Sequence, residues 1–278
     1  MEIPYSSGMG PLGIFDSGFG GLDIARGIRD EFPDLDIAYL GDTARAPYGT
    51  RSQELIHTFT RQCVDFLMEN GSPLVILACN TASSDALREL QKHFIPNQFP
   101  DRNILGVLIP AVQEAVQTTR NERIGVLATP ATVRSRAFER ETNKINPNIS
   151  VFQRACPLLV PLVEAGEHNS PIARAIVKYS LGSFVRETSV DTVILGCTHY
   201  GLLETVIRDV IGSNIKIINE SRAVPSRLRD YLNRHPEYKE RLSHKGTMRC
   251  FTTDLSENFQ TIAPQFFNGP ISIEKISI

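Results

Sequence analysis

The amino-acid sequence predicts an α/β fold of two pseudo-symmetric lobes, each a mostly parallel β-sheet flanked by helices. Short apolar runs alternate with amphipathic stretches along the chain of 278 residues, which is typical of βαβ units. Several runs are unbroken series of Val, Ile and Leu, as in parallel strands buried on both faces. Two short segments also recur in the same order, and the length suits two domains of roughly 100–200 residues each.

The expected strands are the apolar runs at residues 12–15, 36–41, 73–79, 103–109, 123–129, 149–152, 191–197, 214–219 and 248–253. Amphipathic segments between them, such as residues 52–70, predict helices. In open α/β sheets, ligands collect beyond the carboxyl ends of the strands. The residues that directly follow each run are therefore the candidates for a functional site.

Two sequence matches predict that the lobes are related. The segment VILAC at residues 75–79 returns as VILGC at residues 193–197, and GIFDS at residues 13–17 has a counterpart in GVLAT at residues 125–129. Because apolar strands resemble one another, chance similarity is the alternative explanation. Two matches at nearly the same spacing favour two similar lobes, each with one strand that ends in Cys and one that ends in Ser or Thr.

The composition argues against several classes of protein. Lys and Arg total 29 against 31 Asp and Glu, a net charge of −2, so the chain lacks the basic excess that binds nucleic acid. No apolar stretch approaches the ~20 residues of a membrane span, and the start MEIPYSSGMG lacks the basic and apolar regions of a signal peptide. We therefore expect no nucleic-acid or membrane partner and a cytoplasmic location.

The five cysteines are odd in number and contain no C-x-x-C pair. This pattern predicts neither a disulfide framework nor a zinc site, and no other metal-binding motif is present. Cys63 falls in a helical apolar stripe, Cys250 in a strand, and Cys156 precedes an apolar run. We expect these three to be packing residues.

Cys79 lies where an expected strand passes into a helix. The N-terminus of that helix would lower the thiol pKa from about 8.5, and Asn80 and Thr81 add hydrogen-bond donors at the same place. A buried structural cysteine is the alternative, since free thiols are usually buried. The compact polar residues that follow favour a functional thiol.

Cys197 occupies the equivalent junction of the second lobe. Thr198 and His199 follow it, and an imidazole two residues away can activate a nearby thiol. A single thiol of this kind would indicate nucleophilic catalysis, as in Cys–His hydrolases. Two thiols facing each other across a cleft indicate instead that one removes a proton from a carbon while the other delivers a proton to the opposite face. A redox disulfide between Cys79 and Cys197 is the remaining alternative.

Two further turns follow expected strands. The glycine-rich turn that begins at Asp16 is not a dinucleotide fingerprint, because Asp23 stands at the third glycine position. Its glycines would let the backbone approach a small anion; a tight turn capped by Asp16 is the alternative. The turn at residues 41–49 is by itself only a polar loop, and a structural ion pair would explain Asp42 or Arg45 as well as a functional role would.

Five motifs, GIFDSGFGGL, GDTARAPYG, ILACNTAS, ACPLLVPLVEAG and LGCTHYGLL, together closely resemble the cofactor-independent aspartate/glutamate racemase family. The resemblance extends from about residue 11 to about residue 268 in the family's order. It implies a first lobe of residues 10–105 plus 216–278 and a second lobe of residues 106–215. The active site would lie in the cleft between them.

The resemblance implies that Cys79 takes the α-proton of D-glutamate and that Cys197 takes that of L-glutamate. Asp16 resembles a carboxylate near the first thiol, while His199 and Glu164 resemble groups that assist the second. The positions that match substrate-binding residues of the family are Asp16, Ser17, Pro47, Tyr48, Gly49, Asn80, Thr81, Thr129, Thr198 and His199.

The implied activity is the interconversion of L- and D-glutamate, with no cofactor and no metal, to supply D-glutamate for peptidoglycan. The expected strand-end loops contain no lysine suited to a Schiff base, which agrees with a cofactor-free reaction. Aspartate racemisation and a non-catalytic amino-acid sensor on the same scaffold are the alternatives. A homodimer is an expectation that the sequence itself leaves open.

Overall fold

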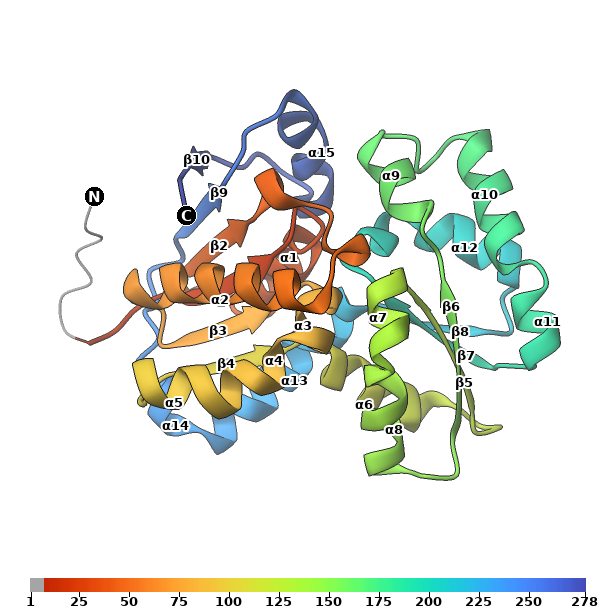
Figure 1. Ribbon diagram of the computed structural model, residues 1–278, viewed down its shortest axis with the longest axis horizontal. Coiled ribbons are helices and arrows are strands. Elements are labelled where there is room, and N and C mark those ends of the chain that lie inside the picture. The colour runs from red at the N-terminus through yellow and green to blue at the C-terminus, as the bar shows by residue number, and fades with distance from the viewer. Residues whose placement is uncertain (1–7) are drawn as a thin grey trace.

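The computed structural model describes residues 8–278, except for the side chains of residues 258 and 259. Two parallel sheets stand side by side, each with helices on both faces (Figure 1). The predicted α/β fold of two lobes is therefore confirmed. Residues 1–7, on which the predicted lack of a signal peptide depends, lie outside the described residues.

The first sheet has six strands in the order β10-β9-β2-β1-β3-β4, all paired in parallel. Its strands are β1 (Leu12–Asp16), β2 (Ile37–Gly41), β3 (Leu74–Leu77), β4 (Asn103–Gly106), β9 (Met248–Thr252) and β10 (Ile273–Lys275). In this register Phe15 lies beside both Leu40 and Leu77, so the chain leaves these strands at one common edge of the sheet.

The second sheet has four parallel strands in the order β6-β5-β7-β8. They are β5 (Arg123–Ala128), β6 (Ser150–Ala155), β7 (Thr192–Gly196) and β8 (Lys216–Ile218). This order repeats the order β2-β1-β3-β4 of the first sheet, with β5 in the place of β1 and β7 in the place of β3. The two sequence matches thus fall on strands that occupy equivalent positions.

Three details differ from the sequence expectations. The run at residues 103–109 ends its strand at Gly106, because the chain turns there and a helix begins at Leu108. The strand β10 was not expected, since three residues are too short for a periodicity signal. Finally, β8 pairs with β7, so Lys216–Ile218 belong to the second sheet and not to the first lobe. The other lobe boundaries stay a prediction.

Fifteen α-helices connect these strands within residues 8–278. They are α1 (Leu22–Glu31), α2 (Gln53–Glu69), α3 (Asn80–Asp85), α4 (Leu87–Glu89), α5 (Ile95–Gln98), α6 (Leu108–Thr118), α7 (Pro130–Ser135), α8 (Ala137–Ile145), α9 (Leu159–Glu164), α10 (Pro171–Leu181), α11 (Phe184–Thr188), α12 (Glu204–Ile211), α13 (Glu220–Arg234), α14 (Pro236–Lys239) and α15 (Glu257–Phe267). The expected helix at residues 52–70 is α2, and Ser52 caps it by accepting a hydrogen bond from the Leu55 N–H.

Alternating side chains of the first sheet fill two separate cores. Ile14 and its neighbours pack with α1 and α13 on one face, as Leu22 and Leu228 show. Phe15 points to the other face, where it belongs to a core that includes Val64 of α2. Because both faces are buried, the strands read as continuous apolar runs.

The second sheet is covered in the same way. Val126 belongs to a core with Phe138 of α8 and Val112 of α6, whereas Leu127 shares a core with Val177 of α10. Burial of both faces fixes the central strands β5 and β7 in register and so fixes the residues that follow them. In the described part of the chain, no helix is both long and apolar enough to cross a membrane.

Candidate active site

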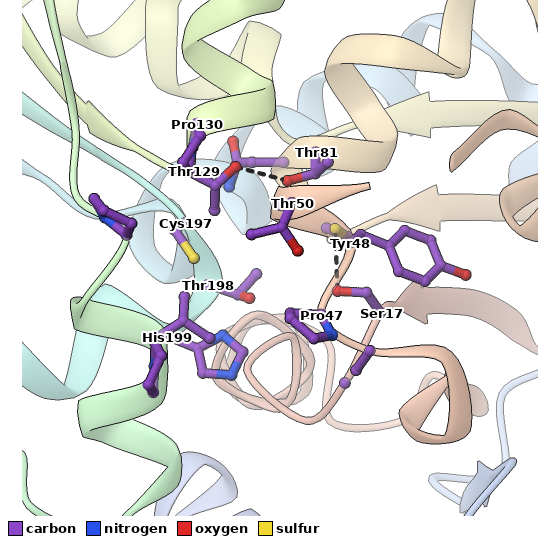
Figure 2. A pocket seen from close by; sticks show the side chains of 18 of the residues that line it. Ser17, Pro47, Tyr48, Thr50, Thr81, Thr129, Pro130, Cys197, Thr198 and His199 are labelled. Atoms are coloured by element: carbon purple, nitrogen blue, oxygen red, sulfur yellow. Dashed lines mark hydrogen bonds between the residues drawn. The ribbon is translucent and has the colours of Figure 1, made fainter. Parts of the chain in front are cut away.

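A cavity of about 100 Å³ lies between the carboxyl ends of the two sheets, several times the volume that one water needs. Figure 2 shows side chains from both lobes turned toward this space. The predicted site residues that line it are Ser17, Pro47, Tyr48, Gly49, Cys79, Asn80, Thr81, Thr129, Glu164, Cys197, Thr198 and His199. The structure thus brings together residues that lie up to 182 positions apart, from Ser17 to His199, at one interlobe cavity.

Asp16 is the one predicted site residue that does not line the cavity. It ends β1 and lies fully buried beneath the following turn, where its carboxylate accepts the Gly18 N–H at 3.1 Å. The Thr198 hydroxyl of the second lobe donates to it at 3.4 Å. Burial raises the pKa of Asp16, and the nearby His199 opposes this shift. Asp16 therefore links the turn that follows β1 to the Cys197 turn of the second lobe.

Cys79 follows β3 and precedes α3. Its thiol donates to the Ser17 hydroxyl at 3.3 Å and is 5% exposed. Burial, with a smaller contribution from the nearby Asp16 charge, raises the pKa of this thiol to about 11. The predicted lowering is therefore wrong, because loss of hydration outweighs the donors of a six-residue helix.

Cys197 follows β7 and precedes a 3₁₀ turn, Thr198–Leu203, in place of an α-helix. The backbone N–H of His199 bonds to its sulfur and favours the thiolate, but burial is the larger effect and raises the thiol pKa. The charges of Cys79, Asp16 and Glu220 act in the same direction as burial. The two thiols are thus close enough for ionisation of one to oppose ionisation of the other.

The His199 imidazole is directed by an acidic partner and by aromatic rings. Its Nε2 lies 3.2 Å from Glu164 Oε1, at the end of α9, and the His199 side chain is 6% exposed. The rings of Phe19 and Phe266 lie at centroid distances of 5.4 Å and 5.7 Å. These contacts fix the ring beside Cys197 in a site from which most water is excluded.

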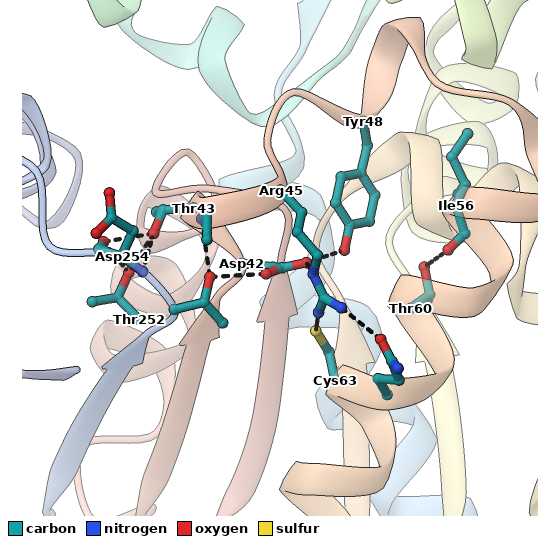
Figure 3. A network of polar contacts seen from close by, with 12 residues as sticks. Asp42, Thr43, Arg45, Tyr48, Ile56, Thr60, Cys63, Thr252 and Asp254 are labelled. Atoms are coloured by element: carbon teal, nitrogen blue, oxygen red, sulfur yellow. Dashed lines mark hydrogen bonds and ion pairs between the residues drawn. The ribbon is translucent and has the colours of Figure 1, made fainter. Parts of the chain in front are cut away.

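The wall contributed by residues 46–50 is held by a buried ion pair, drawn in Figure 3. Asp42 is fully buried and accepts bonds from Arg45 Nε at 2.6 Å and from the Tyr48 hydroxyl at 2.5 Å. The Thr253 hydroxyl donates to its other oxygen at 2.8 Å. The predicted structural ion pair of Asp42 and Arg45 is confirmed. The Tyr48 ring points away from the cavity, so this residue meets the cavity mainly with its backbone.

Three threonine hydroxyls close the opposite end of the cavity across the lobes. Thr81 Oγ1 lies 3.0 Å from Thr129 Oγ1 and 3.3 Å from Thr132 Oγ1, and the last two are 3.1 Å apart. A Cβ on Gly49 would lie 2.7 Å from Thr129 Cβ, so the first-lobe loop also touches this threonine. The two lobes are therefore in direct contact at this end of the cavity.

Other residues of the cavity were not assigned a role from the sequence: Gly18, Ala46, Thr50, Pro130, Cys156, Pro157, Val160 and Pro161. Cys156 through Pro161 form the wall that leads to Glu164, and the motif ACPLLVPLVEAG would have marked this wall as a unit. Cys156 is 1% exposed and its thiol pKa is raised by burial to about 12, so it is a packing residue that also lines the site. Cys63 and Cys250 are buried away from the cavity, as predicted.

The charged side chains at the cavity are few. Among the described residues that line it, the ionisable ones are Tyr48, Glu164, His199 and the three thiols of Cys79, Cys156 and Cys197, without Lys or Arg. In the described residues, no three His, Cys, Asp or Glu side chains are grouped to hold a metal ion. An acidic ligand would accordingly meet backbone N–H groups, hydroxyls and amides.

Comparisons with known proteins agree with this arrangement. The profile of the Asp/Glu/hydantoin racemase family matches residues 23–223. A glutamate racemase of Aquifex aeolicus is 39% identical over 251 residues, covering 90% of this chain and 91% of the relative. The crystal structure of a glutamate racemase isoform from Bacillus anthracis superposes with a TM-score of 0.89 at 31% identity, covering 98% of this chain and 99% of that one. A Francisella tularensis glutamate racemase, solved in complex with D-glutamate, gives 0.86 at 30% identity and covers 98% of both chains.

The similarity to glutamate racemases and the two-lobed α/β fold identify the protein as an isomerase of the amino-acid racemase class. The chain belongs to the Asp/Glu/hydantoin racemase family.

Proposed function

We propose that this protein interconverts L- and D-glutamate by a two-base reaction of Cys79 and Cys197, without a cofactor. The observation that carries the proposal is the placement of two buried thiols, one from each lobe, at one cavity. Glutamate is favoured as the substrate because the relatives named above are glutamate racemases, one of them solved with D-glutamate. The thiols serve as the acid and the base for the two faces of the α-carbon.

In one direction, the Cys197 thiolate removes the α-proton of L-glutamate, and the electron pair of the C–H bond passes to the α-carbon and its carboxylate. The Cys79 thiol then gives its proton to the opposite face, and D-glutamate leaves. The roles reverse in the other direction. Each turnover therefore begins with one thiolate and one thiol, and the next requires their proton states to be restored.

Two features of the site support this chemistry. The raised pKa of each thiol makes its thiolate a strong base once it forms in the closed cavity. His199, which Glu164 holds in place, lies close enough to the Cys197 turn to assist proton exchange there. The Cys79 thiol donates a hydrogen bond to the Ser17 hydroxyl. Preorganised hydroxyls and N–H groups of Thr81, Thr198 and their turns would stabilise the carbanionic charge.

The proposal is tested by incubating the protein with L-glutamate, without added cofactor, and following optical rotation. We expect the rotation to decay toward zero and the α-position to gain deuterium in D₂O. Unchanged rotation over hours would contradict the proposal; tight binding of glutamate without α-exchange would instead support an amino-acid sensor. A panel with L-aspartate separates the two acidic substrates.

We further propose that the D-glutamate formed supplies peptidoglycan synthesis in a bacterial cytoplasm. This proposal follows from the activity, since D-glutamate is a cell-wall amino acid. Depletion of the protein in its host should lower cell-wall D-glutamate and distort cell shape, and added D-glutamate should restore both. Persistence of normal cell-wall composition after depletion would contradict this role.

A further inference from the structure

Glu220 is a buried carboxyl group that the proposed reaction does not use. It is the first residue of α13, at the point where the chain passes from β8 of the second sheet back to the first lobe, and it is 3% exposed. Burial raises its pKa, and the charges of Asp16 and Asp23 add to the shift. A buried carboxyl with these neighbours is costly to the fold, so its presence calls for an explanation.

The one side-chain partner of Glu220 that donates to it in the described structure is Asn80, which follows Cys79 and lines the cavity. Asn80 Nδ2 donates to Glu220 Oε2 at 2.7 Å. The second oxygen of Glu220 and the amide oxygen of Asn80 are both buried and have no hydrogen-bond partner among the described residues. The pair is therefore only partly satisfied, which is unfavourable for stability and points to a role in the site.

Glu220 lies behind both thiol-bearing turns. Through Asn80 it contacts the turn that carries Cys79, and its charge is near enough to Cys197 to raise the pKa of that thiol. An asparagine amide without such a partner could rotate about its last side-chain bond, and its two ends differ in hydrogen-bonding character. The carboxyl of Glu220 removes that freedom by accepting from one end.

We propose that Glu220 is a positioning residue, which fixes the Asn80 amide and, through it, the substrate-binding turn that begins at Cys79. The proposal rests on the proposed racemisation of glutamate. Because Glu220 acts through Asn80, it affects how well the substrate is held and leaves the two proton transfers to the thiols. Loss of Glu220 should raise KM for both enantiomers and change kcat little, because Glu220 is the weakest of the three charges that raise the pKa of the Cys197 thiol.

The test compares Glu220→Met and Glu220→Gln with the wild-type protein in both reaction directions. Met has a similar shape but accepts no strong hydrogen bond, so E220M should raise KM about tenfold and leave kcat within about threefold, as expected for one lost hydrogen bond. E220Q keeps an acceptor oxygen for Asn80 and should restore KM to within about threefold of wild type. An unchanged KM in E220M would overturn the proposal, as would an E220Q variant as impaired as E220M.

Thermal unfolding separates positioning from folding. E220M removes a buried carboxyl but leaves the Asn80 Nδ2 donor without an acceptor, so the two effects on stability oppose each other and the melting temperature should change little while KM worsens. Asp36→Asn is the control, because Asp36 is also a buried carboxyl but lies away from the cavity, at the amino-terminal end of the sheet just before β2. D36N should leave KM unchanged. A tenfold rise of KM in D36N would show that the effect is general and would overturn the proposal.

A double-mutant cycle with Asn80→Ala tests the stated route. E220M should add no further rise in KM once Asn80 is absent, and an undiminished effect would overturn the proposal. Wild-type turnover of L-glutamate is measured first, so that failure of the proposed function is seen separately. If the wild type binds glutamate without turnover, calorimetric Kd replaces KM, and E220M should weaken binding by the same factor.

Discussion

The two thiol-bearing strand ends are equivalent in the fold but differ in what surrounds them. Cys79 follows β3, precedes a short α-helix, and donates to the hydroxyl of Ser17. Cys197 follows β7, the matching strand of the other lobe, but precedes a 3₁₀ turn and receives the His199 backbone N–H. The thiol of the first lobe therefore has a hydroxyl partner, whereas the thiol of the second lobe lies near an imidazole–carboxylate pair.

This difference shows how two thiols with unequal surroundings could serve the two directions of one reaction. Both thiols are buried and have raised pKa values, so the protonated form of each is favoured. Asp16 lies beneath both and raises the pKa of each thiol. The two thiols differ in the neighbour that can share a proton: Ser17 lies beside Cys79, and His199 with Glu164 lies beside Cys197.

Replacement of each thiol by a hydroxyl should produce the largest effects. C79S and C197S should each lower racemisation by about 10²–10⁴-fold, because a serine hydroxyl is a far weaker acid than a thiol. The residual α-deuterium exchange should be enantiomer-specific, with C197S exchanging D-glutamate and C79S exchanging L-glutamate. NMR in D₂O measures it. Full racemisation by either variant, or exchange of both enantiomers alike, would contradict the assignment of one thiol to each face.

The first lobe alone contributes the loop held by Asp42, so disruption of that ion pair should damage one wall of the cavity. Asp42→Asn removes the buried charge that Arg45 and Tyr48 share, and should destabilise the fold by about 3–5 kcal/mol. KM should rise with it because residues 46–50 lose their anchor. Chemical denaturation and steady-state kinetics provide the two measurements, and equal stability of D42N and wild type would contradict this account.

Two glycines allow close contacts with different cavity residues, so alanine at each should affect a different kinetic parameter. A Cβ on Gly49 would meet Thr129, whereas a Cβ on Gly20 would lie 2.5 Å from Thr198 Oγ1 and 2.8 Å from His199 Nδ1. Overpacking of this kind costs about 1–3 kcal/mol. G49A should mainly raise KM, and G20A should mainly lower kcat for L-glutamate, where Cys197 is the base. Identical kinetic changes in the two variants would contradict the division of roles.

The last effect, which leaves activity at neutral pH unchanged, concerns stability at alkaline pH. The Cys79 pKa is raised in the fold from 9.0 to about 11, so the unfolded chain loses this proton first as pH rises. The stabilisation from the neutral buried thiol is complete below pH 9 and is lost between pH 9 and 11, by about 2–3 kcal/mol. The free energy of unfolding should therefore decrease less from pH 8 to pH 10.5 in C79S than in the wild-type protein. Parallel losses in both proteins would show that this thiol is not the group involved.

Much of this architecture was predictable because burial leaves a direct trace in sequence. Strands covered on both faces must be apolar throughout, so VILAC and VILGC marked β3 and β7, and their order in the two sheets confirmed the relation between the lobes. The residues that follow those strands reach one cavity because parallel strands deliver their carboxyl ends to the same edge.

What the sequence did not indicate depends on contacts between distant segments. The direction of the Cys79 pKa shift is set by burial in the folded protein, which no local motif reports. Glu220 reads as an ordinary first-turn acid of a helix, and only the fold places it 2.7 Å from Asn80. The assignment of β8 likewise depends on its partner strand, because Lys216–Ile218 are too few to show which sheet they join.

The three hydroxyls of Thr81, Thr129 and Thr132 form a closed ring, in which each oxygen can give one proton to the next. Such a ring has two equivalent senses of circulation, and in either sense no proton is left over for a guest. An anion that enters must break the circuit and turn at least one hydroxyl toward itself, at a junction where the two lobes meet. Two of the three contacts join Thr81 of the first lobe to the second lobe, so a ligand that takes one of those protons removes one hydrogen bond between the lobes.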